Sequence, residues 1–241
     1  MGLAINCDMG EAFGLYRMGD DAGIMPYISI ANVACGFHAS DPNVMRKTVK
    51  LAKAHNVKVG AHPSLPDLQG FGRREMKMNR DELANCITYQ VGALKGFLDA
   101  EGMKLNHIKP HGALYGMAAR NEEVAHAICD AADAFKVTLL GMAGTLHEKI
   151  YKARGHNFLA EYYVDLEYDQ TGKLIITREH EAVDPKHAVE RTLRAIKEGK
   201  VKSVEGPDIP MRADCICVHS DTPGAVELAK AVHDALKPML N

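Results

Sequence analysis

The sequence predicts an α/β fold in which parallel strands are connected by helices. Short apolar runs with β-propensity alternate with longer segments of helical period from one end of the chain to the other, as parallel strands with crossover helices require. The runs are apolar on both faces, as expected for strands that helices cover. The length of 241 residues also suits an α/β barrel, which commonly forms one domain of about 200–250 residues. We therefore expect a single domain over residues 1–241.

Seven short runs are the predicted strands of this fold. They share high apolar content, and most are followed directly by polar residues or glycine. In order along the chain they cover residues 4–7, 28–34, 57–61, 105–109, 138–141, 158–164 and 215–218.

Five helices are predicted from their start signals. Asp41 precedes a proline at the first helical position, and an apolar stripe then continues to His55. Asn79 and Glu82 form the pattern of a capping box ahead of apolar residues at helical spacing. The other three starts are Asn121, Asp184-Pro185 with an end near Gly199, and Pro223-Gly224 with an end near Leu236.

Two segments interrupt the alternation of strands and helices. Residues 63–78 show neither period, and residues 165–177 are predicted to form a hairpin that turns at 169–172. The chain has no low-complexity linker or short repeat that divides it into two domains.

Composition and charge exclude several classes of protein. The 29 basic and 31 acidic residues give a net charge of -2, so we expect no nucleic-acid partner. No run approaches the roughly 20 apolar residues of a membrane span, and the N-terminus lacks the layout of a signal peptide. We therefore expect a cytoplasmic protein without membrane contact. Its six cysteines contain no Cys-x-x-Cys pair and are interpreted as reduced, buried thiols.

Polar residues gather where the predicted strands end. Asp8 closes the first strand and Glu11 follows it, while Glu161 to Asp165 occupy the end of the sixth. Because the carboxyl ends of parallel strands open on one face, these groups are predicted to share one mouth, as in barrel enzymes. The other strand-end segments are 35–38, 61–63, 109–112 and 219–221.

The histidines divide into two groups by position. His38, His62, His111 and His219 stand at equivalent strand ends, and we expect at least two of them in a functional site. The remaining eight are interpreted as structural or solvated: His55, His107, His126, His147, His156, His180, His187 and His233.

Lys109 and Cys35 are two further candidates for chemistry. Lys109 ends an apolar strand, where burial of an ammonium group requires a carboxylate or a ligand as partner. Cys35 lies three residues before His38, but the sequence between them is no diagnostic motif for an activated thiol. Asp41 and Asp221 are also interpretable as simple helix caps. Motifs for nucleotide phosphates, such as Gly-x-x-x-x-Gly-Lys-Ser/Thr, are missing from the sequence.

Long blocks of this sequence resemble the LamB/YcsF family, whose bacterial members are known as the A subunit of 5-oxoprolinase. The resemblance covers nearly the whole chain and is carried by residues 6–11, 29–39, 60–63, 67–74, 109–115 and 218–225. It implies a seven-stranded β/α barrel of the TIM-barrel type, related to polysaccharide deacetylases. It also implies that the chain acts with two partner subunits to open 5-oxoproline to glutamate at the expense of ATP, which the partners would bind.

The resemblance and the strand-end pattern together give one predicted site. The expected catalytic residues are Asp8, His38, His62, Lys109 and His111, and the expected substrate-binding residues are Asn6, Glu11, Asn32, Asp165, His219 and Asp221. A carboxylate such as Asp8 is a candidate proton acceptor from water, and Lys109 or a histidine is a candidate for stabilising the carbonyl oxygen.

Three alternatives stay open on sequence alone. The chain has Leu166 where the family usually has arginine, which keeps a lactam or cyclic amide other than 5-oxoproline in view. A metal-dependent, deacetylase-like hydrolase acting alone is a second alternative, and a non-catalytic component that binds the lactam is a third.

The metal requirement is open as well. Asp8, His38 and His62 are suitable ligands for a catalytic zinc ion. Lys109 in the same mouth would repel a cation, so the sequence favours a site without a tightly bound metal.

Overall fold

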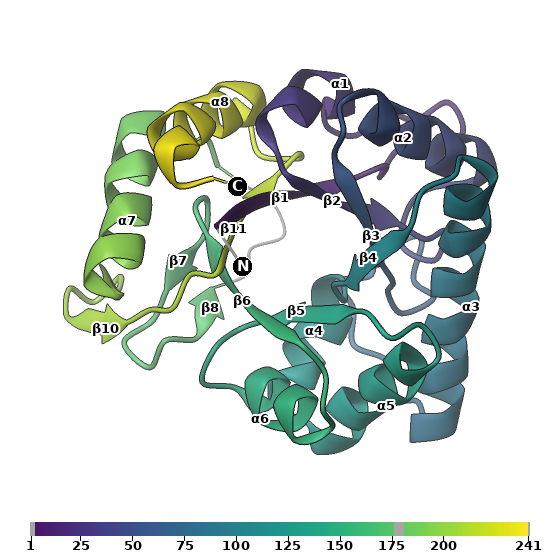
Figure 1. The fold of residues 1–241 in the computed structure, drawn as a ribbon. Coiled ribbons are helices and arrows are strands. Elements are labelled where there is room, and N and C mark those ends of the chain that lie inside the picture. The colour runs from purple at the N-terminus through teal and green to yellow at the C-terminus, as the bar shows by residue number, and fades with distance from the viewer. Residues whose placement is uncertain (1–2, 176–180, 241) are drawn as a thin grey trace.

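The computed structural model describes residues 3–175 and 181–240. Seven parallel strands close into a barrel in the order β1-β11-β6-β5-β4-β3-β2 (Figure 1), which confirms both the α/β class and the seven-stranded barrel. The strands are β1 (Ala4–Met9), β2 (Ile30–Ala34), β3 (Lys58–His62), β4 (Leu105–Ile108), β5 (Thr138–Gly141), β6 (Phe158–Tyr163) and β11 (Cys215–His219).

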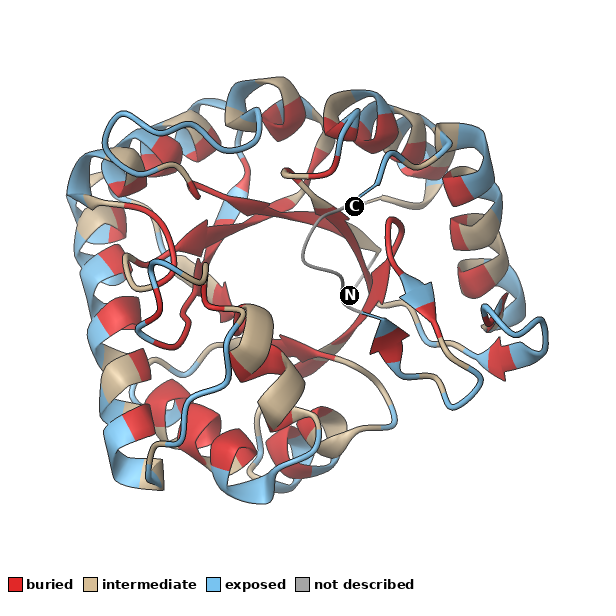
Figure 2. Cartoon of the chain, turned by 180° about the vertical axis from the view of Figure 1, so that it is seen from behind, coloured by how far each residue is buried: buried red, intermediate tan, exposed pale blue. Residues whose placement is uncertain are grey.

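Helices surround the barrel and bury one side against it. Figure 2 shows the strands buried and the helices exposed mainly on their outer sides, as expected for amphipathic helices on a barrel. The larger helices are α2 (Pro42–Ala54), α3 (Arg80–Ala100), α5 (Glu122–Asp133), α7 (Pro185–Glu198) and α8 (Ala225–Leu236). All five predicted helices are therefore confirmed.

The predicted helix starts have the expected hydrogen bonds. The Asp41 carboxylate accepts from the backbone of Asn43 and Val44, and Asn79 and Glu82 form a reciprocal capping box. The side chains of Asn121 and Asp184 likewise cap α5 and α7, and Gly199 ends α7 in the left-handed conformation. These caps fix where each helix leaves the strand end before it.

Several shorter elements were not predicted. The helices α1 (Asp21–Ile24), α4 (Gly112–Ala118) and α6 (Leu146–Ala153) and the one-turn 3₁₀ segments Met25–Tyr27 and Lys237–Met239 are too short to show a clear helical period. The hairpin of β7 (Glu167–Tyr168) and β8 (Leu174–Ile175) confirms the predicted turn, whereas the hairpin of β9 (Lys200–Lys202) and β10 (Asp208–Pro210) was not foreseen. Residues 176 and 177 of the predicted segment and His180 lie outside the described residues.

The apolar core occupies the space between the strands and the helices.

The six cysteines are free thiols; five of them are buried and Cys86 is half-buried, which confirms the expectation of unpaired cysteines. Within residues 3–175 and 181–240, no helix combines the length and the apolar character that crossing a membrane requires.

Candidate functional site

A buried ion-pair network lies at the carboxyl ends of the strands. Lys109 directly follows β4, and its Nζ lies 2.8 Å from Asp8 Oδ1 on β1 and 3.3 Å from Glu161 Oε1 on β6. Burial alone would lower the pKa of Lys109, but Asp8, Cys217 and Glu161 raise it well above its usual value. Burial would likewise raise the pKa of Asp8, but His62 and Lys109 lower it well below the usual range. The site therefore holds a charged ammonium and a charged carboxylate away from water.

Asparagine side chains extend this network into the barrel. Asn32 Nδ2 on β2 donates to Asp8 Oδ1 and to Asn6 Oδ1, both at 2.7 Å. Nε2 of His107 lies 2.6 Å from Asn32 Oδ1, and burial lowers the pKa of His107 to about 3. The interpretation of His107 as structural agrees with this uncharged, buried ring. Its contact with Asn32 also orients the amide that holds Asp8.

Gly60 on β3 provides the space for His107. A Cβ at Gly60 would overlap the His107 imidazole, which its short contact with Asn32 holds in place. We expect Gly60→Ala to destabilise the protein by about 1–3 kcal/mol, the usual cost of overpacking a core, as measured by urea unfolding. Gly92→Ala on α3 is the matched control, because a Cβ there meets open space and should be neutral or stabilising by up to about 1 kcal/mol. Equal stability of Gly60→Ala and the wild type would contradict this packing argument.

Three histidines and a glutamate form a second cluster beside Asp8. His62 Nε2 at the end of β3 lies 3.2 Å from Asp8 Oδ2 and 3.0 Å from Nδ1 of His111. His38 stacks on His111 with ring centroids 3.7 Å apart, and its Nε2 lies 2.9 Å from Glu11 Oε1. Burial lowers the pKa values of His38 and His111 well below the usual range and raises that of Glu11 well above it.

The irregular segment 63–78 closes over this cluster. His111 Nε2 donates to the backbone carbonyl of Phe71 at 2.8 Å, and Phe71 has a positive φ of 53°, which is uncommon for a bulky residue. Gly72 follows with φ of 64°, and a Cβ there would press on His38 and His111. Asp67 fixes the segment by pairing with Arg74. The segment that lacked a periodic pattern therefore serves to position the histidines.

Asp165 and His219 form a carboxylate–imidazole dyad on the other side of Asp8. His219 Nδ1 donates to Asp165 Oδ1 at 2.9 Å, while Asp165 Oδ2 accepts from the His219 backbone and from Thr222 Oγ1. Burial would lower the pKa of His219, but Asp165 raises it above its usual value. His219 Nε2 lies 3.7 Å from Asp8 Oδ2, so the imidazole faces the carboxylate at the centre of the site.

A small cavity connects these three groups of residues. It encloses about 50 Å³, which is room for a few water molecules and hence for a small ligand only. Arg73, whose Nη2 lies 3.0 Å from Asp221 Oδ2, forms part of its wall. Leu166 and Leu174 supply apolar wall, and Asp8, Glu11, His62, Lys109, His111 and His219 also line it.

The structure brings all eleven predicted site residues to this end of the barrel, where Asp221 lines the cavity and pairs with Arg73. Two further residues of the site were not predicted: Glu161, which lies beside Lys109, and Arg73, which pairs with Asp221. Glu161 lies in the strand-end segment 161–165, so position was a usable signal for it. Arg73 lies in the segment 63–78, which shows neither helical nor strand periodicity, and nothing in its local sequence links it to Asp221, which is 148 residues away.

Cys35 does not have the surroundings of a nucleophile. Its Sγ donates to the Val33 carbonyl, and burial raises its pKa to about 12. A thiol with such a pKa is protonated at neutral pH and therefore inert.

Among residues 3–175 and 181–240, two sets of side chains have the composition of metal ligands. Their nitrogen, oxygen or sulfur atoms lie within 4.8 Å of one another; one set is Glu11, His38, His62 and His111, and the other is Asp8, Cys217 and His219. The set expected from sequence, Asp8 with His38 and His62, is thus divided between the two.

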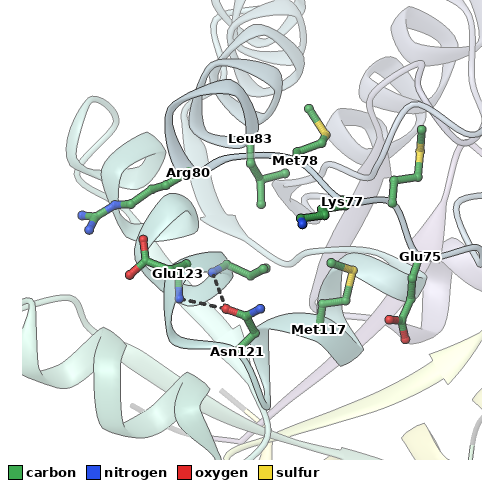
Figure 3. Close-up of a pocket in the computed structure, with 10 residues that line it drawn as sticks. Glu75, Lys77, Met78, Arg80, Leu83, Met117, Asn121 and Glu123 are labelled. Carbon is green, nitrogen blue, oxygen red and sulfur yellow. Dashed lines mark hydrogen bonds between the residues drawn. The ribbon is translucent and has the colours of Figure 1, made fainter.

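A separate groove of about 340 Å³ lies between the segment 75–78, the start of α3 and the helices α4 and α5 (Figure 3). Met78, Leu83 and Met117 form its apolar part. Asn121 caps α5, and Arg80 pairs with Asp130 at 2.6 Å. These polar groups already serve the fold, so the groups suited to chemistry are concentrated at the barrel mouth.

The model of the LamB/YcsF family matches residues 3–239. The chain belongs to the LamB/YcsF family. Among curated members of the family, a lactam utilization protein from Emericella nidulans is 48% identical over 230 residues, which are 94% of this chain and 90% of that protein. The A subunit of 5-oxoprolinase from Bacillus licheniformis is 44% identical over 97% of this chain and 94% of that protein.

A solved structure in the LamB/YcsF family has the same fold. The lactam utilization protein from Thermus thermophilus aligns with a TM-score of 0.92 and 42% identity, covering 99% of this chain and 97% of that one. A deacetylase solved with its substrate aligns with a TM-score of only 0.43 and 14% identity. The expected relation to polysaccharide deacetylases therefore stays a prediction.

Proposed function

We propose that this chain is the lactam-binding, catalytic component of an ATP-dependent hydrolase that opens 5-oxoproline to glutamate together with two partner subunits. The observation that carries the proposal is the buried Lys109–Asp8 pair beside the Asp165–His219 dyad, in one small cavity. Relatives named as the A subunit of 5-oxoprolinase share 44–46% of its residues over nearly the whole chain. Their name supports both the substrate and the existence of partners.

The proposed roles follow from the charge and position of each group. The Lys109 ammonium stabilises the negative charge that develops on the lactam carbonyl oxygen when water attacks. His219 gives a proton to the ring nitrogen as the C–N bond breaks and takes up the proton that the attacking water loses, so it ends the cycle in its starting state. Asp8, whose low pKa makes it a poor proton acceptor, holds Lys109 in place and balances its charge. This changes the role that the sequence suggested for Asp8.

ATP is assigned to the partner subunits in this proposal. The sequence has no phosphate-binding loop, and the buried side chains of the mouth include carboxylates, which repel phosphate. Because the proposed reaction consumes ATP, we propose that the protein acts in the cytoplasm.

The cavity wall also suggests how a lactam carboxylate is recognised. Leu166, which stands where the family usually has arginine, is buried and lines the cavity. Arg73 lines the same cavity from the segment 63–78, and we propose that its guanidinium meets the substrate carboxylate. Without that contact, an uncharged cyclic amide would be the better substrate.

The proposed function is tested by glutamate release and by ring opening of 2-pyrrolidinone, which is the same ring without the carboxylate. We expect the chain alone to open neither compound and to hydrolyse no ATP. With its partner subunits and ATP, it should open 5-oxoproline at a rate at least about 10-fold above that of 2-pyrrolidinone. Turnover by the chain alone would support the independent hydrolase instead. Equal rates on both compounds would assign the site to uncharged lactams.

A further inference from the structure

The hydrogen bonds of His62 and His111 determine which ring nitrogens carry protons. His62 Nδ1 lies 2.7 Å from the Lys109 backbone carbonyl, and His111 Nε2 lies 2.8 Å from the Phe71 carbonyl. A carbonyl oxygen can only accept a hydrogen bond, so each of these two nitrogens must be the protonated one. In a neutral imidazole the other nitrogen then has a lone pair and no hydrogen.

When both rings are neutral, the two nitrogens without hydrogen face each other. His62 Nε2 and His111 Nδ1 are 3.0 Å apart, and Asp8 Oδ2 lies 3.2 Å from the same His62 nitrogen. Glu11 Oε1 lies 3.6 Å from His111 Nδ1. Several lone pairs therefore converge in a buried space, and their mutual repulsion favours a positive charge between them. A proton on His62 Nε2 bridges that nitrogen to Asp8 or to His111, whereas one metal ion binds both imidazole nitrogens and the Glu11 carboxylate at once.

We propose that His62 Nε2, His111 Nδ1 and the Glu11 carboxylate bind one divalent transition-metal ion. Two imidazoles and a carboxylate are a common ligand set for zinc and related ions. The backbone carbonyls of Lys109 and Phe71 orient the two rings, as outer partners of metal-bound histidines usually do. His38, 2.9 Å from Glu11 Oε1, positions the carboxylate. The three ligands also line the small cavity, so the ion would face the ligand space.

Lys109 does not oppose a cation at this position. Its Nζ lies 2.8 Å from Oδ1 of Asp8 and 3.3 Å from Glu161, so two carboxylates balance its charge. His62 contacts Asp8 through the other carboxylate oxygen, Oδ2. The charge of Lys109, which disfavours a metal on sequence alone, is thus balanced by its partners in the structure.

Metal binding is tested on the purified full chain after treatment with a chelator, without substrate or partner subunits. We expect about one equivalent of Zn²⁺ to stay bound after desalting, and Co²⁺ to give visible absorption bands that Zn²⁺ displaces. His62→Asn, His111→Asn and Glu11→Gln should each weaken Zn²⁺ binding by about 100-fold or more, and His38→Gln by about 10–100-fold. His147→Asn is the matched control, because His147 is a buried histidine with other partners, and it should keep wild-type affinity.

Thermal unfolding gives a second readout of the same proposal. Zn²⁺ should raise the Tm of the wild type but not that of His111→Asn. Each protein is compared with and without Zn²⁺, because His111→Asn also loses the bond to the Phe71 carbonyl. If His111→Asn does not fold, Glu11→Gln takes its place. Failure of Zn²⁺ and Co²⁺ to bind at millimolar concentration, or unchanged affinity in the three ligand variants, would overturn the proposal. Because no turnover is measured, this result is independent of the proposed lactam hydrolysis.

Discussion

Replacing Lys109 with methionine is expected to reduce turnover of the assembled complex by about 100-fold or more. Methionine keeps most of the length of the side chain but removes the charge proposed to stabilise the carbonyl oxygen, and loss of one such group usually costs about 10²–10³ in rate. Initial rates of glutamate release at saturating 5-oxoproline and ATP measure this effect. Wild-type turnover in this variant would remove Lys109 from the mechanism.

The same replacement is also expected to destabilise the fold. Asp8 and Glu161 would lose the ammonium between them, and breaking a buried pair by removing one partner costs about 3–5 kcal/mol. The double variant Lys109→Met with Asp8→Asn removes one of the two carboxylates that lose their partner. It should recover part of the stability in urea unfolding without recovering turnover, which separates catalysis from folding. Lys230→Met on the exposed face of α8 is the control and should change neither.

Replacing His219 with asparagine is expected to lower turnover by about 10²–10⁴-fold, the usual contribution of a general acid. Asp165→Asn should lower turnover as well. Both Asp165 carboxylate oxygens accept hydrogen bonds from His219 or Thr222, and the amide nitrogen that replaces one oxygen cannot accept. If His219 served only to bind the lactam, its variant would raise KM and leave kcat unchanged. That outcome would contradict the proposed proton transfer.

The pKa of His219 gives an independent measure of the dyad. In NMR titration of the chain alone, we expect the His219 pKa to lie above 6.5 in the wild type and to fall in Asp165→Asn, since Asp165 raises it. The stability from His219 is fully present below pH 6.5 and is lost as pH rises through its folded pKa. The pKa of Asp165 is lowered by His219 against the effect of burial, so its share is present above about pH 3.9 and is lost in acid. The dyad therefore stabilises the fold most between about pH 3.9 and pH 6.5.

The sequence determined the barrel and the location of its site. Seven apolar runs with helices between them require parallel strands, and the carboxyl ends of parallel strands meet on one face. Position alone therefore selected Asp8, Lys109 and the strand-end histidines, and the structure places them in contact. The helix caps at Asp41 and Asn79 were also readable, because each involves residues at most three positions apart.

Only the tertiary structure decided which of these groups pair and with what charge. His107 contacts Asn32, which is 75 positions away, and Lys109 pairs with carboxylates on both β1 and β6. The tautomers of His62 and His111 depend on two backbone carbonyls, one of them in the segment 63–78 that shows no periodic pattern. Such contacts arise from the closure of the barrel and from the path of one loop over its mouth. These contacts cannot be predicted from local sequence, because side-chain pairing across strands depends on burial and on residues that are close in space but distant along the chain.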